Sequence, residues 1–404
     1  MNWEKVKLGE IADFSNGINF GKDAYDKGIK LIGVYDFGNR FSPDYDSLDE
    51  VKEEVVKKND ILLSGDMVFV RSNGNKELVG RCMLIDCPIV PVTYSGFCIR
   101  ARLKDTTKHY PTFWTYHFKN SSFRRAMSGT AVGANIQNLS QSRLSTYEAI
   151  VPDYESQVRI AKVLSSYDNL IKNNQKQIKL LEEAAQRLYK EWFVDLRFPG
   201  CEDVDVVDGV PEGWRYKRVE ELGEVITGKT PSTAKTEYYG GSIPFVTIPD
   251  MHGTVFPLVT EKTLTKVGAD TQKSKYLPAN TVIVSCIATV GLVNIAIEPC
   301  QTNQQINSVI LHDDNNLYFF YESMKRIKAL LDGVGSNGAT MTNVNKTKFS
   351  NIKVLYPTED LVMKYNEFCK PIFDKILALS KAMLIYEQSR DRLLPKLMSG
   401  EIEV

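Results

Sequence analysis

The sequence predicts an α+β fold, in which two domains of mixed β/α structure are separated by a long antiparallel two-helix coiled coil and related by an internal pseudo-two-fold duplication. Three observations support this prediction. The chain repeats itself at an interval of about half its length. Each repeat begins with β-rich runs interrupted by polar loops. Each repeat ends in a long segment whose apolar residues recur with helical periodicity.

The repeat is clearest just before the two helical segments, where matched motifs are 205 positions apart. The matched motifs are Gly133-Ala134 with Gly338-Ala339, Asn138-Leu139 with Asn343-Val344, Arg143-Leu144 with Lys348-Phe349, and Pro152 with Pro357. Nearer the two starts, Leu8-Gly9-Glu10 matches Leu222-Gly223-Glu224 at a separation of 214. The first copy therefore contains about nine additional residues (214 − 205 = 9). A period of this length indicates a duplicated domain rather than a solenoid.

The length and composition fit two domains. The chain has 404 residues, more than one core usually covers, and its 43% hydrophobic and 25% charged residues are ordinary for a globular protein. We expect a first domain at residues 1–153, a first helix region at 154–197, a linker at 198–213, a second domain at 214–357 and a second helix region at 358–404. The linker is expected at the surface, because it has Pro and Gly at both ends and only acidic charges.

Each variable domain contains a β-type run that ends in a polar loop. In the first copy, the β-rich run 67–70 leads into a polar loop at 71–76 that contains Asn73-Gly74, a dipeptide typical of hairpin turns. In the second copy, the run 281–284 leads into residues 285–289. Gly- and Asn-rich segments follow at 128–133 and 333–338, and they resemble neither a P-loop nor a dinucleotide-binding fingerprint.

The first helical segment carries an a/d seam, in which apolar positions alternate in steps of four and three. Its one polar member is Asn174. The seam residues are Tyr167, Ile171, Asn174, Ile178, Leu181, Ala185, Leu188 and Trp192. Ser165 and Asp168 resemble a capping box, so we expect a short helix over 154–164 to give way to a separate long helix there.

The second helical segment carries an equivalent seam. Its residues are Ile372, Ile376, Leu379, Met383, Tyr386, Arg390, Leu393 and Leu397. Pro371 matches Ser166 of the first copy, and we expect it in the first turn of the helix, where its missing N–H costs nothing. We expect Pro395 to kink or fray the last turn.

The two seams are predicted to pack against each other. A helix of roughly 28 residues at 1.5 Å per residue is about 42 Å long, which few small domains can cover. An antiparallel pair would bury both stripes and place the two domains at opposite ends. The alternative is that each helix packs only on its own domain as an ordinary core helix. Our candidates for helix pairing and for docking of partner subunits are Tyr167, Ile171, Ile178, Leu181, Leu188, Trp192, Ile376, Leu379, Met383, Tyr386, Leu393 and Leu397.

The polar loops suggest DNA recognition. They are rich in Arg, Lys, Asn, Gln, Ser and Thr, the side chains that read base edges and hold phosphates, although solvated loops favour the same residues. Two similar but non-identical domains on a rigid rod suit the reading of two short sequences on one duplex, because about 42 Å exceeds one DNA turn of ~34–36 Å. The candidate DNA contacts are Arg71, Ser72, Asn73, Asn75, Lys76, Arg81, Asn135, Gln137, Lys229, Thr230, Ser232, Asn337, Thr340 and Asn343.

Charge and composition limit the alternatives. The formal net charge is zero, with 50 basic and 50 acidic residues, whereas a free-standing nucleic-acid binder is usually basic. Either the chain binds no nucleic acid, or partner subunits supply most of the phosphate contacts. Seven cysteines without a C-x-x-C and four histidines without an H-x-x-x-H spacing predict packing residues and no metal site. No run is long and apolar enough to cross a bilayer, so we expect a cytoplasmic location.

Three motifs resemble those of a known family, the specificity subunits of type I restriction-modification enzymes. The first is Leu188-Tyr189-Lys190-Glu191-Trp192-Phe193-Val194-Asp195 followed by Phe198-Pro199-Gly200, and the second is Leu393-Leu394-Pro395-Lys396-Leu397-Met398-Ser399-Gly400-Glu401-Ile402. The third, in the first variable domain, is Val68-Phe69-Val70-Arg71-Ser72-Asn73-Gly74 with Val79-Gly80-Arg81. The resemblance covers essentially the whole chain. The second domain departs from it at 285–289, where no Arg-Ser-Asn occurs.

The resemblance implies a non-catalytic subunit with two target-recognition domains. The N-terminal domain would read one half of a bipartite, asymmetric DNA site and the C-terminal domain the other half. The helices would set the spacer and dock two methyltransferase subunits, which bind S-adenosylmethionine, while restriction subunits use ATP for translocation and cleavage. No cofactor is expected in this chain; S-adenosylmethionine, ATP and Mg²⁺ would be held by the partners.

Two other functions remain open at this stage. The chain lacks an N/D-P-P-Y/F motif for methylation of a flipped base, and it lacks a P-loop and an obvious nuclease cluster. The first alternative is a stand-alone DNA methyltransferase or nuclease with unrecognised catalytic residues. The second is a coiled-coil adaptor that binds only proteins.

Overall fold

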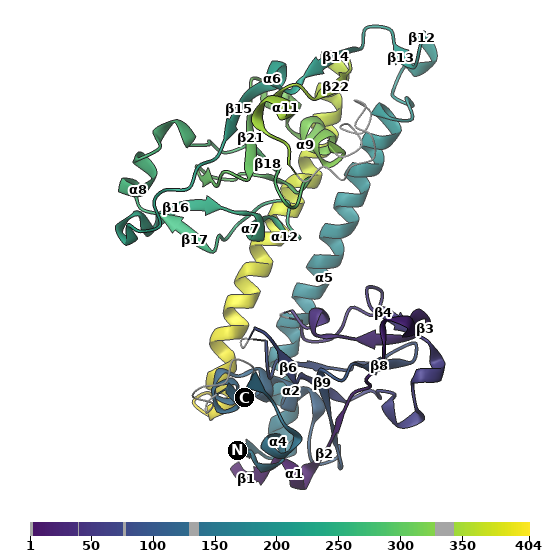
Figure 1. Ribbon diagram of the computed structural model, residues 1–404, viewed down its shortest axis with the longest axis vertical. Coiled ribbons are helices and arrows are strands. Elements are labelled where there is room, and N and C mark those ends of the chain that lie inside the picture. The colour runs from purple at the N-terminus through teal and green to yellow at the C-terminus, as the bar shows by residue number, and fades with distance from the viewer. Residues whose placement is uncertain (1–2, 39, 76–77, 129–136, 328–342) are drawn as a thin grey trace. The chain divides into compact units, whose positions relative to one another are not determined.

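The computed structural model describes residues 3–38, 40–75, 78–128, 137–327 and 343–404. These residues form two compact units, which Figure 1 shows with their elements labelled. Unit 1 consists of Met1–Lys172 and Ile385–Val404, and unit 2 of Asn173–Leu384. Each unit thus contains a part of both predicted helix regions. Within the described ranges, no helix combines the length and apolar character that a membrane span requires.

Unit 1 is built on two β-sheets. The first has the antiparallel order β2-β9-β5-β7 and the second the order β4-β3-β8, in which β3 and β8 are parallel. The strands are β2 (Ala12–Asn16), β3 (Tyr25–Ile32), β4 (Asp49–Val51), β5 (Met67–Val70), β7 (Cys82–Leu84), β8 (Val92–Tyr94) and β9 (Cys98–Leu103). Short pairs join β1 (Trp3–Lys7) to β11 (Glu148–Pro152) and β6 (Ser72–Asn73) to β10 (Gln137–Asn138). The predicted hairpin is confirmed as β5 and β7.

The core of unit 1 lies on both faces of β5. Met67 and Phe69 point into a cluster with Trp114 and Phe118, whereas Val68 and Val70 point into a second cluster on the other face. All four residues of β5 are buried, as expected for a strand covered on both faces. The helices of this unit, apart from the long ones, are α1 (Leu8–Ile11), α2 (Pro111–Lys119), α3 (Ser121–Ser128) and α4 (Gln141–Thr146).

Unit 2 repeats this topology. Its sheets have the orders β15-β21-β18-β19 and β17-β16-β20, and β14 pairs with β22. The strands are β14 (Arg215–Arg218), β15 (Gly223–Thr227), β16 (Tyr239–Val246), β17 (Lys262–Leu264), β18 (Val282–Ser285), β19 (Val293–Ile295), β20 (Gln301–Thr302), β21 (Ile306–Leu311) and β22 (Lys353–Tyr356). The shorter helices are α6 (Val219–Leu222), α7 (Ile248–Met251), α8 (Lys266–Asp270), α9 (Leu317–Lys325) and α11 (Lys346–Ser350).

The duplication extends to local irregularities. The pairing register of β3 shifts between Tyr25 and Ile29, and that of β16 shifts between Tyr239 and Ile243, 214 positions later. The helices α4 and α11 are capped in the same way. The side chain of Ser140 accepts a hydrogen bond from the backbone of Arg143 (3.1 Å), and that of Asn345 accepts one from Lys348 (2.9 Å). The predicted duplication is therefore confirmed at the level of bulges and caps.

Each helix region is one continuous helix. The first, α5, runs over Tyr154–Phe193 (40 residues) and the second, α12, over Glu359–Ser399 (41 residues). The predicted break between 164 and 167 is wrong. Ser165 does not cap a new helix, because its hydroxyl donates to the carbonyl of Lys162 one turn earlier (3.3 Å). Asp168 is engaged by side chains from other elements.

The prediction that Pro371 lies in the first turn of its helix is also wrong, whereas the kink or fraying expected at Pro395 stays a prediction. Pro371 lies thirteen residues into the helix rather than in its first turn, and the helix continues for four residues beyond Pro395. A proline in a helix interior removes one hydrogen bond and costs about 3 kcal/mol. Buried residues beside each proline offset this cost: Phe373 stacks on Tyr318 with ring centroids 4.3 Å apart, and Leu397 lies in the core of unit 1.

The two long helices contact each other in both units. In unit 1, the side chain of Arg159 bonds the carbonyl of Val404 (2.7 Å), and Asp168 pairs with Arg390 further along α5. As the residue number on α5 rises from 159 to 168, the number of the residue that it contacts falls from 404 to 390. The two helices are therefore antiparallel. In unit 2, the hydroxyl of Tyr365 donates to the carbonyl of Ala185 (3.1 Å). The alternative that each helix packs only on its own domain is excluded, because the last turns of α12 lie in the core of unit 1.

The seam residues are all buried or half-buried in the structure. Between α5 and the second copy, the chain forms the small pair β12 (Val206–Val207) and β13 (Val210–Pro211). The residues of β12 are exposed, whereas Val210 is half-buried and Pro211 is buried. All seven cysteines are free, and five of them are buried.

Candidate nucleic-acid interface

Four strand ends meet at one edge of unit 1. β2 and β5 end there, and β7 and β9 begin there, because neighbouring strands of this sheet are antiparallel. The loops that follow or precede these ends, together with β6 and β10, form a polar surface. We call this the unit 1 edge, and it comprises residues 16–19, 71–75, 95–97 and 137–138.

The unit 1 edge is braced by backbone hydrogen bonds. The N–H of Gly17 bonds the carbonyl of Cys98 (3.2 Å), that of Ile18 the carbonyl of Tyr94 (3.0 Å), and that of Gly96 the carbonyl of Ile18 (2.6 Å). A Cβ atom at Gly17 would lie only 2.2 Å from the carbonyl oxygen of Ser95, so the close approach of these loops requires glycine. A braced loop loses little entropy when a ligand binds.

The predicted contacts Arg71, Ser72 and Asn73 lie together at this edge, each half-buried. The guanidinium of Arg71 donates to the carbonyl of Gly96 (3.2 Å). Ser72 and Asn73 form β6 and pair with Asn138 and Gln137 of β10. Asn75 is exposed on the same loop, where its N–H bonds the side chain of Asn73 (2.7 Å).

The sequence interpretation missed Phe97, which lies at the centre of this edge. Its carbonyl accepts the N–H groups of Arg71 (2.7 Å) and Ser72 (3.3 Å), and its side chain is 63% exposed. The sequence gives only a weak indication of the role of Phe97, which is the turn predicted at Ser95-Gly96 just before it. Phe97 reaches the edge through the pairing of β8 with the distant strand β3, which no local pattern reveals.

Unit 2 has an edge with the same backbone plan, which we call the unit 2 edge: residues 227–230, 286–289, 303–305 and 343. The N–H of Lys229 bonds the carbonyl of Thr302 (2.9 Å), and the hydroxyl of Thr230 donates to the side chain of Gln304 (2.6 Å). Asn343 bridges to Ile287 as Asn138 pairs with Ser72 in unit 1. The structure thus brings together the predicted residues Lys229, Thr230 and Asn343.

The two edges carry different side chains on equivalent backbone positions. The N–H of Cys286 bonds the carbonyl of Gln305 (2.9 Å), exactly as that of Arg71 bonds Phe97, so Cys286 replaces Arg71 and Gln305 replaces Phe97. The unit 1 edge thus has a half-buried guanidinium and an exposed aromatic ring, where the unit 2 edge has a thiol that is buried in the core and a half-buried amide.

The other predicted contacts lie elsewhere. Ser232 is exposed three positions after Lys229. Lys76, Asn135, Asn337 and Thr340 lie outside the residues that the structure describes.

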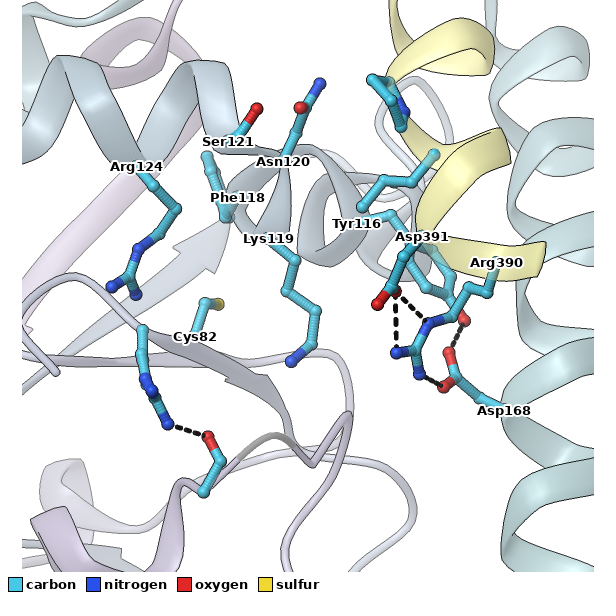
Figure 2. Close-up of a pocket in the computed structure, with 14 residues that line it drawn as sticks. Cys82, Tyr116, Phe118, Lys119, Asn120, Ser121, Arg124, Asp168, Arg390 and Asp391 are labelled. Atoms are coloured by element: carbon cyan, nitrogen blue, oxygen red, sulfur yellow. Dashed lines mark hydrogen bonds and ion pairs between the residues drawn. The ribbon is translucent and has the colours of Figure 1, made fainter. Parts of the chain in front are cut away.

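Arg81 belongs to a pocket in unit 1, shown in Figure 2. Its guanidinium donates to the carbonyl of Gly38 (2.6 Å). The pocket is also lined by Lys119 at the end of α2 and Arg124 in α3. We call it the basic pocket. Lys119 and Arg124 were not predicted, because nothing in the sequence places the junction of α2 and α3 next to Arg81.

A charged network joins three helices at the wall of this pocket. Asp168 of α5 pairs with Arg390 of α12 (2.5 Å) and accepts a hydrogen bond from the hydroxyl of Tyr116 in α2. Arg390 also pairs with Asp391 (2.8 Å). The side chains of Asp168 and Arg390 are only 15% and 13% exposed, so each ion depends on the other for its stability. Figure 2 shows the network beside the pocket.

Unit 2 contains a buried carboxyl group in α9, the helix that corresponds to α2 of unit 1. Glu322 of α9 is 1% exposed, and its Oε1 has no hydrogen-bond partner in the described part of the chain. Burial raises its pKa to about 7, while Lys325 opposes and Glu182 adds to the increase. The histidine at 117 of unit 1 is likewise buried, and burial lowers its pKa to about 4, so it is neutral at pH 7.

The chain is similar to proteins of one family. Residues 1–183 and 211–360 match the family described as type I restriction modification DNA specificity domain. The chain is 30% identical to the type I restriction enzyme HindI specificity subunit of Haemophilus influenzae, over 99% of this chain and 100% of that one. It is 27% identical to the type I restriction enzyme MjaIX specificity subunit of Methanocaldococcus jannaschii, over 72% and 68% of the two chains.

A solved structure shares the fold. The S subunit of a type I restriction-modification system from M. genitalium superposes with a TM-score of 0.59 at 16% sequence identity, covering 98% of this chain and 96% of that one. This likeness extends over both units and both long helices, and it agrees with the fold predicted from the sequence.

Proposed function

The chain belongs to the type I restriction-modification DNA specificity family and is a specificity subunit of such a system, and on this premise we propose that its two edges read the two halves of one bipartite, asymmetric DNA site. Unit 1 would read one half and unit 2 the other. The observation that carries this proposal is the pairing of one backbone plan with two different sets of side chains. Equal scaffolds place both edges against DNA in the same manner, and unequal side chains select different bases.

We further propose that the chain performs no chemistry of its own. It would act by positioning partners: two methyltransferase subunits that bind S-adenosylmethionine, and restriction subunits that use ATP and Mg²⁺. The long helices are the proposed docking surface and the spacer between the half-sites. Partners that close around the DNA would supply most of the phosphate contacts, which agrees with the zero net charge of this chain. We place the complex in the cytoplasm with its DNA.

The test of DNA reading uses the chain assembled with its methyltransferase subunits. Sequencing of modified bases in DNA exposed to this complex should return one asymmetric site with two defined parts and a fixed gap. Exchange of residues 71–75 and 97 for a set from a relative should then change one part only. A complex that shifts all DNA equally would contradict the proposal and favour a protein-binding adaptor.

The test of catalysis uses the purified chain alone. Incubation with DNA and S-adenosylmethionine, or with DNA and Mg²⁺, should give neither methylation nor cleavage. The same reactions with the methyltransferase subunits added serve as the positive control for methylation. Turnover by the chain alone would support the alternative of a stand-alone methyltransferase or nuclease.

A further inference from the structure

Two large aromatic side chains are exposed at neighbouring strand ends of unit 1. The side chain of Tyr35 is fully exposed, and that of Phe97 is 63% exposed. Tyr35 is the third residue after Ile32 of β3, and Phe97 is the third residue after Tyr94 of β8 (35 − 32 = 3; 97 − 94 = 3). Ile32 and Tyr94 are partners in the parallel pairing of these two strands, which Figure 1 labels in unit 1. Paired strands are ~4.8 Å apart, so both residues leave the sheet at the same edge. We call Tyr35 and Phe97 the aromatic pair.

The backbone around Tyr35 is anchored on both sides of the residue. The N–H of Gly33 donates to the carboxylate of Asp36 (2.7 Å), which closes the turn that contains Tyr35. The next side chain, that of Phe37, is 1% exposed and packs in the core of unit 1. The turn therefore holds the ring of Tyr35 in water, where it forgoes the stabilisation that burial of apolar area provides.

The backbone around Phe97 is anchored in a similar way. Its carbonyl accepts the N–H groups of Arg71 (2.7 Å) and Ser72 (3.3 Å), and the side chain of Cys98, which follows it, is fully buried. A braced position loses little conformational entropy when it contacts a ligand. Exposed aromatic rings on braced loops are therefore well suited to binding.

Unit 2 has the same turns without the rings. Its strands β16 and β20 pair in parallel, with Val246 opposite Thr302. The third residues after these partners are Pro249 and Gln305 (249 − 246 = 3; 305 − 302 = 3). The carboxylate of Asp250 accepts the backbone N–H three positions before it (2.8 Å), as the carboxylate in the turn of unit 1 does. The shared fold therefore does not require the aromatic pair, which is a chemical feature of unit 1.

The chemistry of the phenyl ring limits what Phe97 can contact on DNA. The ring has no hydrogen-bond donor or acceptor, so it gains only from apolar parts of the duplex. These are the C5-methyl group of thymine in the major groove and the faces of the bases. Base faces become accessible only when the duplex is unstacked, and an inserted ring needs both of its own faces free. Because the side chain of Phe97 is partly covered by its own unit, the thymine methyl group is the favoured partner.

We propose that Phe97, with Tyr35 beside it, recognises thymine through its C5-methyl group in the half-site that the unit 1 edge reads. This inference rests on the proposed function and adds to it the class of base that is selected. The contact removes apolar area of the ring and of the methyl group from water. Arg71, whose N–H is bonded to the carbonyl of Phe97, would contact the polar base edges beside this thymine.

The experiment replaces single thymines of the recognised site by uracil, which keeps the hydrogen-bonding groups of thymine and lacks only the methyl group. Affinity is measured for the complex with its methyltransferase subunits. At one thymine or more of the half-site read by unit 1, uracil should weaken the unaltered complex about fourfold, the effect of one methyl group lost from an apolar contact. The double variant Tyr35→Ser with Phe97→Gln should bind the thymine and uracil sites equally, because its contact is already lost. Phe97→Leu should retain the uracil effect, because leucine is also apolar.

The matched control is Tyr216→Ser in unit 2. It changes an aromatic side chain that is 59% exposed and lies in β14, outside both edges, and it should leave the uracil effect unaltered. Melting temperatures of all variants show whether the chain remains folded. A half-site for unit 1 that contains no thymine would overturn the proposal. A double variant that keeps the full uracil effect would also overturn it, because another residue would then contact the methyl group.

Three further outcomes are distinguishable. Permanganate oxidises unstacked thymines. Strong oxidation in the complex that disappears in the double variant, without a uracil effect, would show that the rings stack on bases and that the methyl assignment is wrong. Loss of methyltransferase co-purification in the double variant would identify a protein contact and overturn the DNA assignment. Absence of sequence-dependent binding by the unaltered complex would instead reject the proposed function itself.

Discussion

Arg71 and Cys286 occupy equivalent backbone positions of the two units but have different side chains. Each donates its N–H to the carbonyl of a residue at the same place in its unit, Phe97 or Gln305. These bonds involve only main-chain atoms, so they are kept whatever side chains are present. The side chains then differ. Unit 1 has a half-buried guanidinium and an exposed ring, whereas unit 2 has a buried thiol and the half-buried amide of Gln305, which changes the hydrogen bonding and stacking that each edge can offer.

We expect Arg71→Ala to weaken binding to one half-site. Loss of a guanidinium that contacts a base lowers the binding free energy by about 1–3 kcal/mol. The complex should then discriminate less strongly between the correct base and other bases at that position of the site. The measurement is affinity of the assembled complex for a panel of sites with single changes in either half. Arg187→Ala, at an exposed position of α5 in unit 2, is the control. Equal relaxation in both halves would contradict the assignment of Arg71 to one half.

We expect Glu322→Gln to remove a pH dependence of stability. The folded pKa of about 7 lies above the ordinary value of 4.5, so the stability that the protonated group contributes is complete below pH 4.5 and is lost as pH rises through 7. The amide cannot ionise. The variant should be more stable at pH 8, by roughly 3 kcal/mol, and little changed near pH 5. Thermal unfolding at the two pH values measures this difference.

The control for this effect is Glu367→Gln, at an exposed position of α12. Between pH 5 and pH 8, the free energy of unfolding of Glu367→Gln should change by the same amount as that of the unaltered chain. A gain for Glu322→Gln of equal size at pH 5 and pH 8 would show that ionisation of the carboxyl is not its cause.

Among the elements, the sequence predicted periodic features better than helix ends. The seams of α5 and α12 are buried as their periodicity predicts, because the stripe that repeats every 3.5 residues must face a partner. The breaks expected at Ser165 and Pro371 are wrong for a physical reason. A cap or a proline is a local effect of about 1–3 kcal/mol, and the burial of large side chains such as Phe373 outweighs it.

The candidate site was predictable only in part for a related reason. Arg71, Ser72 and Asn73 follow a β-run and a turn signal, which are local. Phe97 and Lys119 reach their places through strand and helix packing between segments far apart in the sequence. No local pattern in a single amino-acid sequence reveals contacts between such distant segments.

We expect Arg390→Met to destabilise unit 1 by about 3–5 kcal/mol, because it leaves Asp168 ionised and poorly solvated. The double variant Asp168→Leu with Arg390→Met should be markedly more stable than Arg390→Met alone. Chemical denaturation of the four chains measures the coupling as a double-mutant cycle. Two single changes that add without coupling would show that the pair contributes little, as surface pairs do.

At the scale of the whole molecule, both long helices contribute residues to both units. Under the proposed function, we expect their length to set the spacer between the half-sites. The 40 and 41 residues of α5 and α12 correspond to roughly 60 Å each at 1.5 Å per residue. The sequence alone suggested about 42 Å, since it placed the helix starts too late. The unit boundaries at residues 172 and 384 are the natural points for testing a spacer role.

We expect seven residues inserted after both Lys172 and Leu384 to lengthen the recognised spacer by about three base pairs. One heptad keeps the seams in phase, and it adds about 10.5 Å of helix against ~3.4 Å per base pair. Sequencing of modified bases reads the spacer directly. Insertion of seven polar residues in the linker at 206–209 is the control and should leave the spacer as it was. An unaltered spacer in the helix variant would contradict the hypothesis that the length of the two long helices sets the spacer.

The closure of unit 1 by residues 385–404 has a consequence for synthesis. Leu394, Leu397 and Met398 complete a core whose other members precede Asn173, so the ribosome makes all of unit 2 before it makes the segment that seals unit 1. Until translation reaches those residues, the apolar side chains of unit 1 that they cover remain exposed to solvent. A ribosome that stalls earlier would release a polypeptide with an unsealed first unit, open to chaperones and proteases, so quality control could discard a half-made DNA reader before it joins its partners.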